Sequence, residues 1–193
     1  VHPESRLDFT RPDAFGIVAE EHRTVRENVG VLDMSLMAKL MVQGPDALAV
    51  LNRLSTSDID RETGRLVYTQ WLDETGGIMA DLTVTRLDEQ QFMVVASDVI
   101  HRRVEPMIRR ATRPGEIAVV TDITSAVTLL SVQGPSSREL ISRLSDADLS
   151  NDAFPYLSAR QIHVGYAPVL AARVTYLGEL GWELHVPTEY ATG

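Results

Sequence analysis

Two segments of this chain repeat one another, and the repeat limits the folds that the chain can adopt. The first runs from Val42-Gln43-Gly44-Pro45 to Ser55, and the second runs from Val132-Gln133-Gly134-Pro135 to Ser145. Both end in Arg-Leu-Ser at the same offset, so duplication explains them better than a coincidence of two common turns. In each copy an apolar, strand-like approach meets Gly-Pro, which turns the chain and suits the start of a helix.

A helical pattern follows each Gly-Pro pair, and further strand-like segments follow each helix. Apolar residues recur at helical spacing in both copies, at Leu48, Leu51 and Leu54 and at Leu140, Ile141 and Leu144. The repeat therefore predicts an α+β fold made of two pseudo-symmetric halves, each a sheet with a helix packed on it.

The order of these segments predicts three parts. Residues 1–35 form an N-terminal helix, expected over Gly16 to Val29, and a lead-in that ends in a turn at Asp33-Met34-Ser35. Residues 36–120 form the first half, and residues 121–193 form the second half. The sequence begins without methionine and stops at Thr192-Gly193, soon after a strong strand. We therefore expect a portion of a longer protein, with the second half incomplete and truncated at the C-terminus.

Composition excludes several classes of function. The formal net charge is −9, and the basic residues never cluster densely enough to follow a phosphate backbone, so we expect no nucleic-acid partner. No apolar run is long enough to span a membrane, so we expect no membrane partner. The absence of cysteine excludes disulfides and cysteine nucleophiles and is typical of an intracellular protein. The five histidines are scattered and never fall three or four residues apart, so we expect no metal site.

A hairpin is predicted between the two copies, over residues 65–87. Its turn signal is Asp73-Glu74-Thr75-Gly76-Gly77. Pairing Leu72 with Gly77 places Tyr68 opposite Asp81, and cross-strand neighbours of this kind have Cβ atoms about 5 Å apart. Aspartate is disfavoured in the middle of a strand, so a tyrosine opposite Asp81 favours a functional site. The alternative is the solvated face of an antiparallel sheet.

A second polar cluster is predicted near the end of the chain, in the run from Tyr176 to Glu183. Its two glycines, Gly178 and Gly181, do not suit a regular strand, so the run is expected to bend sharply. Apolar, strand-like residues flank it, and carboxylates held between buried strands are costly unless a partner fills the adjacent space. A polar ligand with amide and amine donors would serve. The alternative is a surface hairpin with solvated glutamates.

Taken together, these motifs resemble the folate-dependent aminomethyltransferase family, the T-protein of the glycine cleavage system. The matching segments follow in order over nearly the whole chain: Asp33 to Ser35, Val42 to Ala47, Gly64 to Tyr68, Gly76 to Leu82, Val132 to Pro135 and Tyr176 to Glu183. The likeness is closer to the C-terminal folate domain of the flavin-dependent dimethylglycine and sarcosine dehydrogenases, through Tyr68 to Trp71, Asp81 to Leu87 and Gly178 to His185.

The resemblance implies a fold and a site. The fold is the T-protein-type folate-binding domain, with two pseudo-duplicated, ferredoxin-like halves. Asp81 corresponds to the catalytic acidic residue beside the reactive nitrogens of tetrahydrofolate, with Tyr68 in support. Glu183 corresponds to the residue that binds the donor edge of the pterin ring, and Tyr176 and Tyr156 to aromatic residues of the folate pocket. The chain departs from the family at Ala96-Ser97-Asp98, where asparagines are frequent.

The resemblance also implies an activity. The chain would bind tetrahydrofolate and capture a methylene group from an oxidised N-methyl amine, of dimethylglycine or sarcosine type, to give 5,10-methylene-tetrahydrofolate. FAD would be bound only by an upstream domain that this chain lacks, since no dinucleotide fingerprint occurs here. The location would be the bacterial cytoplasm or the mitochondrial matrix. The alternatives are a stand-alone aminomethyltransferase, a non-catalytic folate-binding scaffold and an interaction domain.

Overall fold

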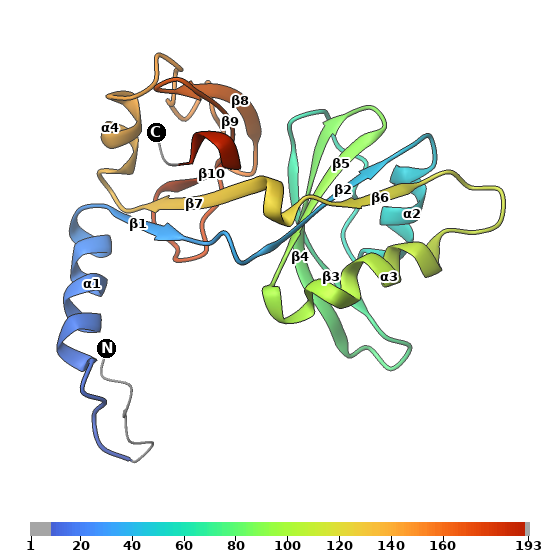
Figure 1. Ribbon diagram of the computed structural model, residues 1–193, viewed down its shortest axis with the longest axis horizontal. Helices are drawn as coiled ribbons and strands as arrows, with labels where there is room; N and C mark the ends of the chain where they lie inside the picture. The colour runs from blue at the N-terminus through green and yellow to red at the C-terminus, as the bar shows by residue number, and fades with distance from the viewer. Residues whose placement is uncertain (1–8, 192–193) are drawn as a thin grey trace.

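The computed structural model describes residues 9–191 of the chain and contains two five-stranded antiparallel sheets. The sheets lie side by side, with the helix α1 (Phe15–Glu27) extending away from both (Figure 1). The first sheet has the strand order β3-β4-β5-β2-β6, and the second has the order β1-β7-β10-β9-β8. This mixed α/β architecture confirms the predicted fold class.

The first copy of the repeat supplies most of the first sheet. Its elements are β2 (Ala38–Gln43), α2 (Ala47–Leu54), β3 (Leu66–Leu72), β4 (Ile78–Asp88), β5 (Gln91–Ala96), the short 3₁₀ helix η1 (Asp98–Ile100), α3 (His101–Ala111) and β6 (Val119–Asp122). The second copy supplies β7 (Val127–Gln133), α4 (Ser137–Ser142), β8 (Ala159–Val164), β9 (Ala167–Ala172) and β10 (Gly181–Pro187), with 3₁₀ helices η2 (Thr124–Ala126) and η3 (Thr188–Tyr190) beside them. Each Gly-Pro pair therefore lies between a strand and a helix, as the repeat predicts.

The two sheets share one topology, because the strand before Gly-Pro takes the same place in each. In the first sheet β2 lies between β5 and the outer strand β6, and in the second β7 lies between β10 and the outer strand β1. Strand β1 (Gly30–Asp33) comes from the N-terminal lead-in, yet it pairs with β7 of the second sheet. A helix precedes each outer strand, α3 before β6 and α1 before β1.

The chain crosses between the sheets twice, and the two crossings pair with each other (Figure 1). One crossing joins β1 to β2, and the other joins β6 to β7. Backbone hydrogen bonds tie each crossing to the strand that adjoins the other, from Met34 N to Leu129 O of β7 at 2.8 Å and from Ile123 N to Lys39 O of β2 at 2.9 Å. The Asp33-Met34-Ser35 turn predicted from the sequence lies in the first crossing, where Ser35 N donates to Asp33 Oδ1 at 2.9 Å.

Each sheet buries one face under helices, the first under α2 and α3 and the second under α4. Trp71 and Trp182 are fully buried, one in each core, and Trp182 packs edge-on against Phe154. The opposite faces of the two sheets contact each other through a smaller cluster that includes Met93, Val95 and Leu129. Side chains alternate along a strand, so a polar residue that follows or precedes a core residue points to the opposite face, in or near this contact.

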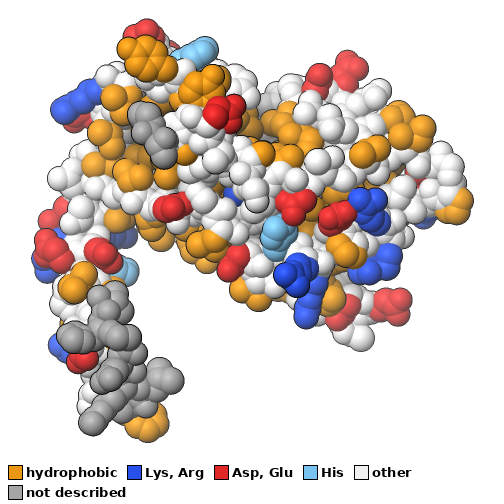
Figure 2. Space-filling view, viewed as in Figure 1, with side chains coloured by type: hydrophobic (Ala, Val, Ile, Leu, Met, Phe, Trp, Pro, Cys, Tyr) orange, Lys and Arg blue, Asp and Glu red, His pale blue; other side chains and the backbone are white. Residues whose placement is uncertain are grey.

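The helices at the surface differ in how they are partnered. Helix α1 buries none of its residues, whereas α3 buries Val104 and Ile108 against the first core. Figure 2 shows cationic side chains gathered over α3 in an otherwise acidic protein. Within residues 9–191, no helix has both the length and the apolar composition needed to cross a membrane.

Substituting Gly44 by alanine should destabilise the folded protein at the first Gly-Pro turn. Gly44 has φ +134°, and a Cβ there would lie 2.3 Å from the carbonyl oxygen of Ile117. We expect a loss of about 3 kcal/mol in unfolding free energy. Gly76→Ala is the matched control, because Gly76 also has positive φ, +86°, but open space around it, and strain alone costs about 1 kcal/mol. Equal losses in urea unfolding would show that the close approach to Ile117 carries no cost.

Candidate functional site

Tyr68 and Asp81 form a hydrogen-bonded pair on the exposed end of the first sheet. The Tyr68 hydroxyl donates to Asp81 Oδ2 at 2.9 Å. The hydrogen bond to Asp81, together with burial, raises the pKa of the Tyr68 hydroxyl, so the phenol stays protonated and remains the donor at neutral pH. The ring of Tyr68 is 53% exposed, which leaves the pair open to a ligand.

The predicted strand register for this pair is wrong by two residues. Tyr68 lies opposite Thr83, and Asp81 lies opposite Gln70. One residue of the difference comes from the turn, where Leu72 pairs with Ile78 and not with Gly77, and the other comes from an irregularity between Trp71 and Leu72. A two-residue shift keeps side chains on the same face of a sheet, so the long tyrosine side chain still reaches Asp81 along the diagonal.

Tyr176 lies in the bend between β9 and β10, as predicted. The bend includes Gly178 at φ +79°, and its Tyr176 side chain is 81% exposed. Among the influences that raise the pKa of Tyr68, the Tyr176 hydroxyl is the smallest. The far end of the bend is fixed, since Glu179 pairs with Arg26 of α1 at 2.8 Å and Leu180 O accepts from Gly134 N at 2.8 Å.

Glu183 lies on the face of β10 that is turned away from the second core. Trp182, Leu184 and Val186 point into that core, so Glu183 and His185 share the opposite face. Burial raises the pKa of Glu183 to about 7, although the charge of Lys39 acts in the other direction. Within residues 9–191 no side chain or backbone group donates a hydrogen bond to the Glu183 carboxylate.

His185 and Lys39 are neighbours of Glu183 that the sequence reasoning missed. His185 is 4% exposed, its Nδ1 has no hydrogen-bond partner, and burial lowers its pKa to about 3. Lys39 is 0% exposed, at the start of a strand that is otherwise apolar up to Val42. One signal was available in the sequence: Lys39 is the only lysine of the 193 residues, and it lies inside a strand-like run.

The structure does not join Tyr156 to the other four predicted residues by any hydrogen bond. Its ring is 52% exposed, and its carbonyl oxygen accepts from Arg65 Nη1 at 3.3 Å. The next residue, Leu157, accepts from Leu66 N at the start of β3. Tyr156 therefore lies where the two sheets meet, next to a residue that bonds Leu66, two residues before Tyr68 on β3. Its role in the site stays a prediction.

This arrangement suits a flat ligand that carries hydrogen-bond donors. An unpaired, largely buried carboxylate is costly, and N–H groups of a ligand would satisfy it with strong, charge-assisted hydrogen bonds. Tyr68 and Tyr176 are exposed aromatic rings that can pack on such a ligand. A metal does not fit this site equally well, because no group of three or more metal-binding side chains occurs within the described part of the chain.

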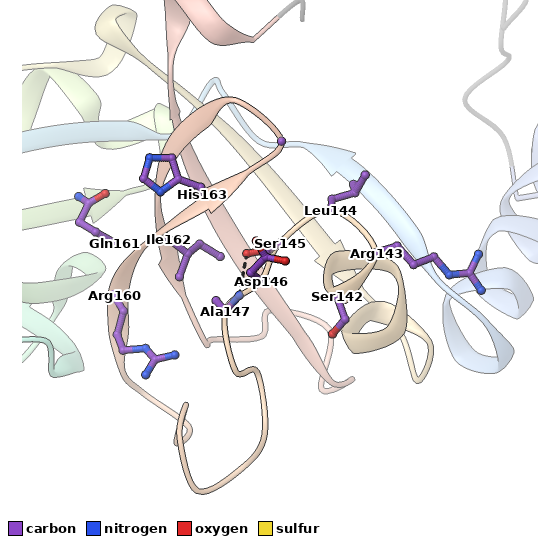
Figure 3. Close-up of a pocket in the computed structure, with 11 residues that line it drawn as sticks. Ser142, Arg143, Leu144, Ser145, Asp146, Ala147, Arg160, Gln161, Ile162 and His163 are labelled. Atoms are coloured by element: carbon purple, nitrogen blue, oxygen red, sulfur yellow. Dashed lines mark hydrogen bonds between the residues drawn. The ribbon is translucent and has the colours of Figure 1, made fainter.

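Two surface hollows lie away from these residues. Figure 3 shows the first, between the end of α4 and β8, where Arg160 donates to the carbonyls of Ala153 and Asp148. The second is beside α3, where His101 contacts Asp122 at 2.6 Å. None of the five predicted site residues lines either hollow. The predicted site residues lie away from both hollows, with Tyr68 and Tyr176 exposed and Glu183 only partly exposed.

Comparison with known proteins identifies the family of this chain. The protein family described as the GCVT N-terminal domain matches residues 3–193. The chain belongs to this family. The family resemblance inferred from the motifs is thereby confirmed.

The relatives of this chain include both an oxidase and an aminomethyltransferase. The chain is 40% identical to a 4-methylaminobutanoate oxidase (formaldehyde-forming) of Paenarthrobacter nicotinovorans, covering 98% of this chain and 23% of the relative. It is also 40% identical to an aminomethyltransferase of Streptomyces coelicolor, covering 94% of this chain and 48% of the relative. The chain thus spans 23% of the length of the first relative and 48% of the length of the second.

A solved structure supports the fold. The glycine cleavage system aminomethyltransferase T from Bartonella henselae superimposes with a TM-score of 0.78 at 27% identity, covering 91% of this chain and 46% of that protein. The GCVT N-terminal domain of this chain therefore has the fold of the corresponding part of an aminomethyltransferase, as the resemblance implied.

Tyr68→Phe should lower the rate of one-carbon transfer while leaving the fold intact. The substitution removes the hydroxyl that orients Asp81, and the loss of one hydrogen bond to a charged group corresponds to about tenfold in rate. Thermal unfolding should not change, because the pair is exposed. Tyr166→Phe is the control, since Tyr166 is 97% exposed and lies outside the site. Full activity of Tyr68→Phe would show that Asp81 needs no orientation by Tyr68.

Proposed function

We propose that this chain is a tetrahydrofolate-binding domain that captures the methylene group of an oxidised N-methyl amine and yields 5,10-methylene-tetrahydrofolate. The observation that carries the proposal is the Glu183 carboxylate, only partly exposed and without a hydrogen-bond partner within residues 9–191, on which the charge of Lys39 acts. Lys39 pairs with Val95, Val95 with Thr83, and Thr83 with Tyr68 of the exposed Tyr68–Asp81 pair, so these residues form one row across the first sheet. The Glu183 carboxylate suits the recognition of a ring edge, and the Tyr68–Asp81 pair suits chemistry on a solvent-accessible carbon.

Glu183 and the tyrosines would hold the ligand. The pterin ring of a reduced folate presents N–H donors along one edge, which an ionised carboxylate accepts strongly. Tyr176, on the bend after β9, would pack on the ring, and Tyr156 would extend the aromatic surface. Since the bend is fixed at Glu179 and Leu180, ligand binding has to order only its exposed part.

Asp81 would act at the reacting centre. Tetrahydrofolate would supply two nucleophilic nitrogens, N5 and N10, which replace the amine on the methylene carbon of an iminium and release two protons, one of them leaving with the amine. The Asp81 carboxylate would stabilise the cationic iminium and accept the second proton. Tyr68, which stays protonated, would fix the carboxylate by its hydrogen bond.

In this proposal, the oxidation that forms the iminium does not take place on this chain. It removes two electrons from the amine, and we assign it to a flavin-containing domain or subunit joined to this one. The relative from Paenarthrobacter nicotinovorans, named as an oxidase of an N-methyl amine and much longer than this chain, supports that assignment.

A second candidate function is aminomethyl transfer from a carrier-bound donor, without an attached oxidase. It is favoured by the aminomethyltransferase of Streptomyces coelicolor, which is equally identical to this chain. The two functions share the folate site and differ in the donor. We place N-methyl amine oxidation first because Gly178 to His185 follows the dehydrogenase pattern.

The test uses the complete protein that carries this chain. It would be given tetrahydrofolate and dimethylglycine labelled with ¹³C in the methyl groups, and the products would be followed by NMR. We expect ¹³C in the bridging carbon of 5,10-methylene-tetrahydrofolate, with less free formaldehyde than in a reaction without folate. Transfer only from an aminomethylated carrier would favour the second candidate. No binding of tetrahydrofolate by calorimetry would overturn both.

A further inference from the structure

Lys39 has an unusual position for a lysine. It is the only lysine in the chain, whose other cationic side chains are arginines, and its side chain is fully buried. Lysine is almost never fully buried unless it is paired, because the ammonium loses its hydration. The fold therefore bears a cost at Lys39 that a neutral residue would avoid.

The contacts of the ammonium do not neutralise its charge. Nζ donates to the carbonyl oxygens of Ser35 at 3.0 Å and Met37 at 2.7 Å. Both acceptors are neutral, and an ammonium has three donors. Among residues 9–191 no carboxylate lies within ion-pair distance of Lys39. The charge thus acts on its surroundings through the low-polarity interior, where electrostatic effects reach further than in water.

The backbone places this charge beside the face of β10 that carries Glu183. Ser35 and Met37 lie in the crossing between the sheets, and the Ser35 hydroxyl accepts from Leu129 N of β7 at 3.2 Å. Leu129 pairs with His185 on β10. Glu183 is two residues from His185 and on the same face. Lys39 therefore reaches this part of the second sheet from the first.

Among the charged groups around Glu183, Lys39 is the cation that acts on its carboxylate. His185 is kept neutral by burial and by Lys39, which lower its pKa to about 3. Asp33 and Asp122 act on Lys39 and favour its charged form, against burial, which lowers the pKa of Lys39. Burial alone would protonate Glu183, and Lys39 opposes this by lowering the Glu183 pKa.

We infer that Lys39 is a positioning residue that keeps the Glu183 carboxylate ionised, so that Glu183 can accept hydrogen bonds from the ligand. Lys39 acts through Glu183 and need not touch the ligand. The part of this inference that concerns ligand binding rests on the proposed function, whereas the coupling between Lys39 and Glu183 does not.

The first test is the pH dependence of tetrahydrofolate binding by the complete protein, measured by calorimetry between pH 6 and 9. Affinity should rise with pH as Glu183 ionises. In Lys39→Met the rise should move to higher pH by about one pH unit, because a nearby opposite charge is lost. Glu183→Gln should remove the rise. If Lys39→Met weakens binding equally at every pH, Lys39 has only a structural role and the inference is wrong.

The second test needs no ligand and remains valid if Lys39→Met does not fold. Lysine labelled with ¹³C at Cε gives an NMR signal for Lys39, which Lys39→Arg identifies by its loss. In Glu183→Gln this signal should titrate at lower pH than in the unsubstituted protein, because the carboxylate no longer favours the ammonium. Titration at the same pH in both proteins would overturn the inference. A positive result without folate binding would instead refute the proposed function alone.

Discussion

Asp81→Asn is expected to lower the rate of folate-dependent one-carbon transfer by about 10²- to 10⁴-fold, the usual contribution of a positioned acid or base. Asparagine keeps the size of the side chain and can still accept the hydrogen bond from Tyr68 through its amide oxygen. It has no negative charge and cannot accept a proton at neutral pH. Initial rates of formation of 5,10-methylene-tetrahydrofolate by the complete protein would measure the loss.

The control for Asp81→Asn is Asp88→Asn, at the other end of the same strand. Asp88 is exposed and pairs with Gln91 beside the tight turn to β5, far along β4 from the site. Its substitution should leave both rate and folate affinity unchanged. Folate affinity should also be unchanged in Asp81→Asn, because we propose that Glu183, and not Asp81, binds the pterin ring. If Asp81→Asn keeps the full rate, the proposed role of Asp81 is wrong.

The sequence predicted the layout of the fold because the duplicated segments contain local signals, the Gly-Pro turns and the apolar periodicity that follows them. Gly44 and Gly134 both have positive φ and both lie against another backbone, so neither position tolerates a side chain and the Gly-Pro turns stand out. The strand β5 and the helix after each turn follow from apolar periodicity. What local signals do not contain is the partner of β1, since its pairing with β7 joins residues far apart in the sequence, such as Gly30 and Gln133.

The site was predictable residue by residue but not in its geometry. The spacing of Tyr68 and Asp81 identified the pair. The pairing of Leu72 with Ile78 and the irregularity between Trp71 and Leu72 each moved the register by one residue, because a turn sequence does not reveal how the strand beside it adjusts. Lys39 escaped notice for a different reason. A single charged residue in a strand is normally solvent-facing, and only the packing of the second sheet onto the first buries it.

Glu183→Gln should abolish tight folate binding and, at the same time, stabilise the unliganded protein at alkaline pH. Loss of hydrogen bonds to a charged acceptor should weaken tetrahydrofolate binding by about 10- to 100-fold in calorimetry. The stabilisation follows from burial, which raises the pKa of Glu183 from 4.5 to about 7. Such a shift means that the folded state favours the protonated carboxyl by about 3 kcal/mol, as an upper estimate.

The sign of the pH effect distinguishes this explanation from a general gain in packing. Between pH 4.5 and about 7 the folded protein holds the Glu183 proton more tightly than the unfolded chain does, so its stability falls as pH rises through this window. Glutamine does not titrate, so Glu183→Gln should be nearly neutral at pH 4.5 and most stabilising at pH 8. Thermal unfolding at both pH values, with the exposed Glu189→Gln as control, would measure it. A gain that is the same at both pH values would refute the buried, unpaired carboxylate, and with it the reason why this site should prefer a ligand rich in N–H donors.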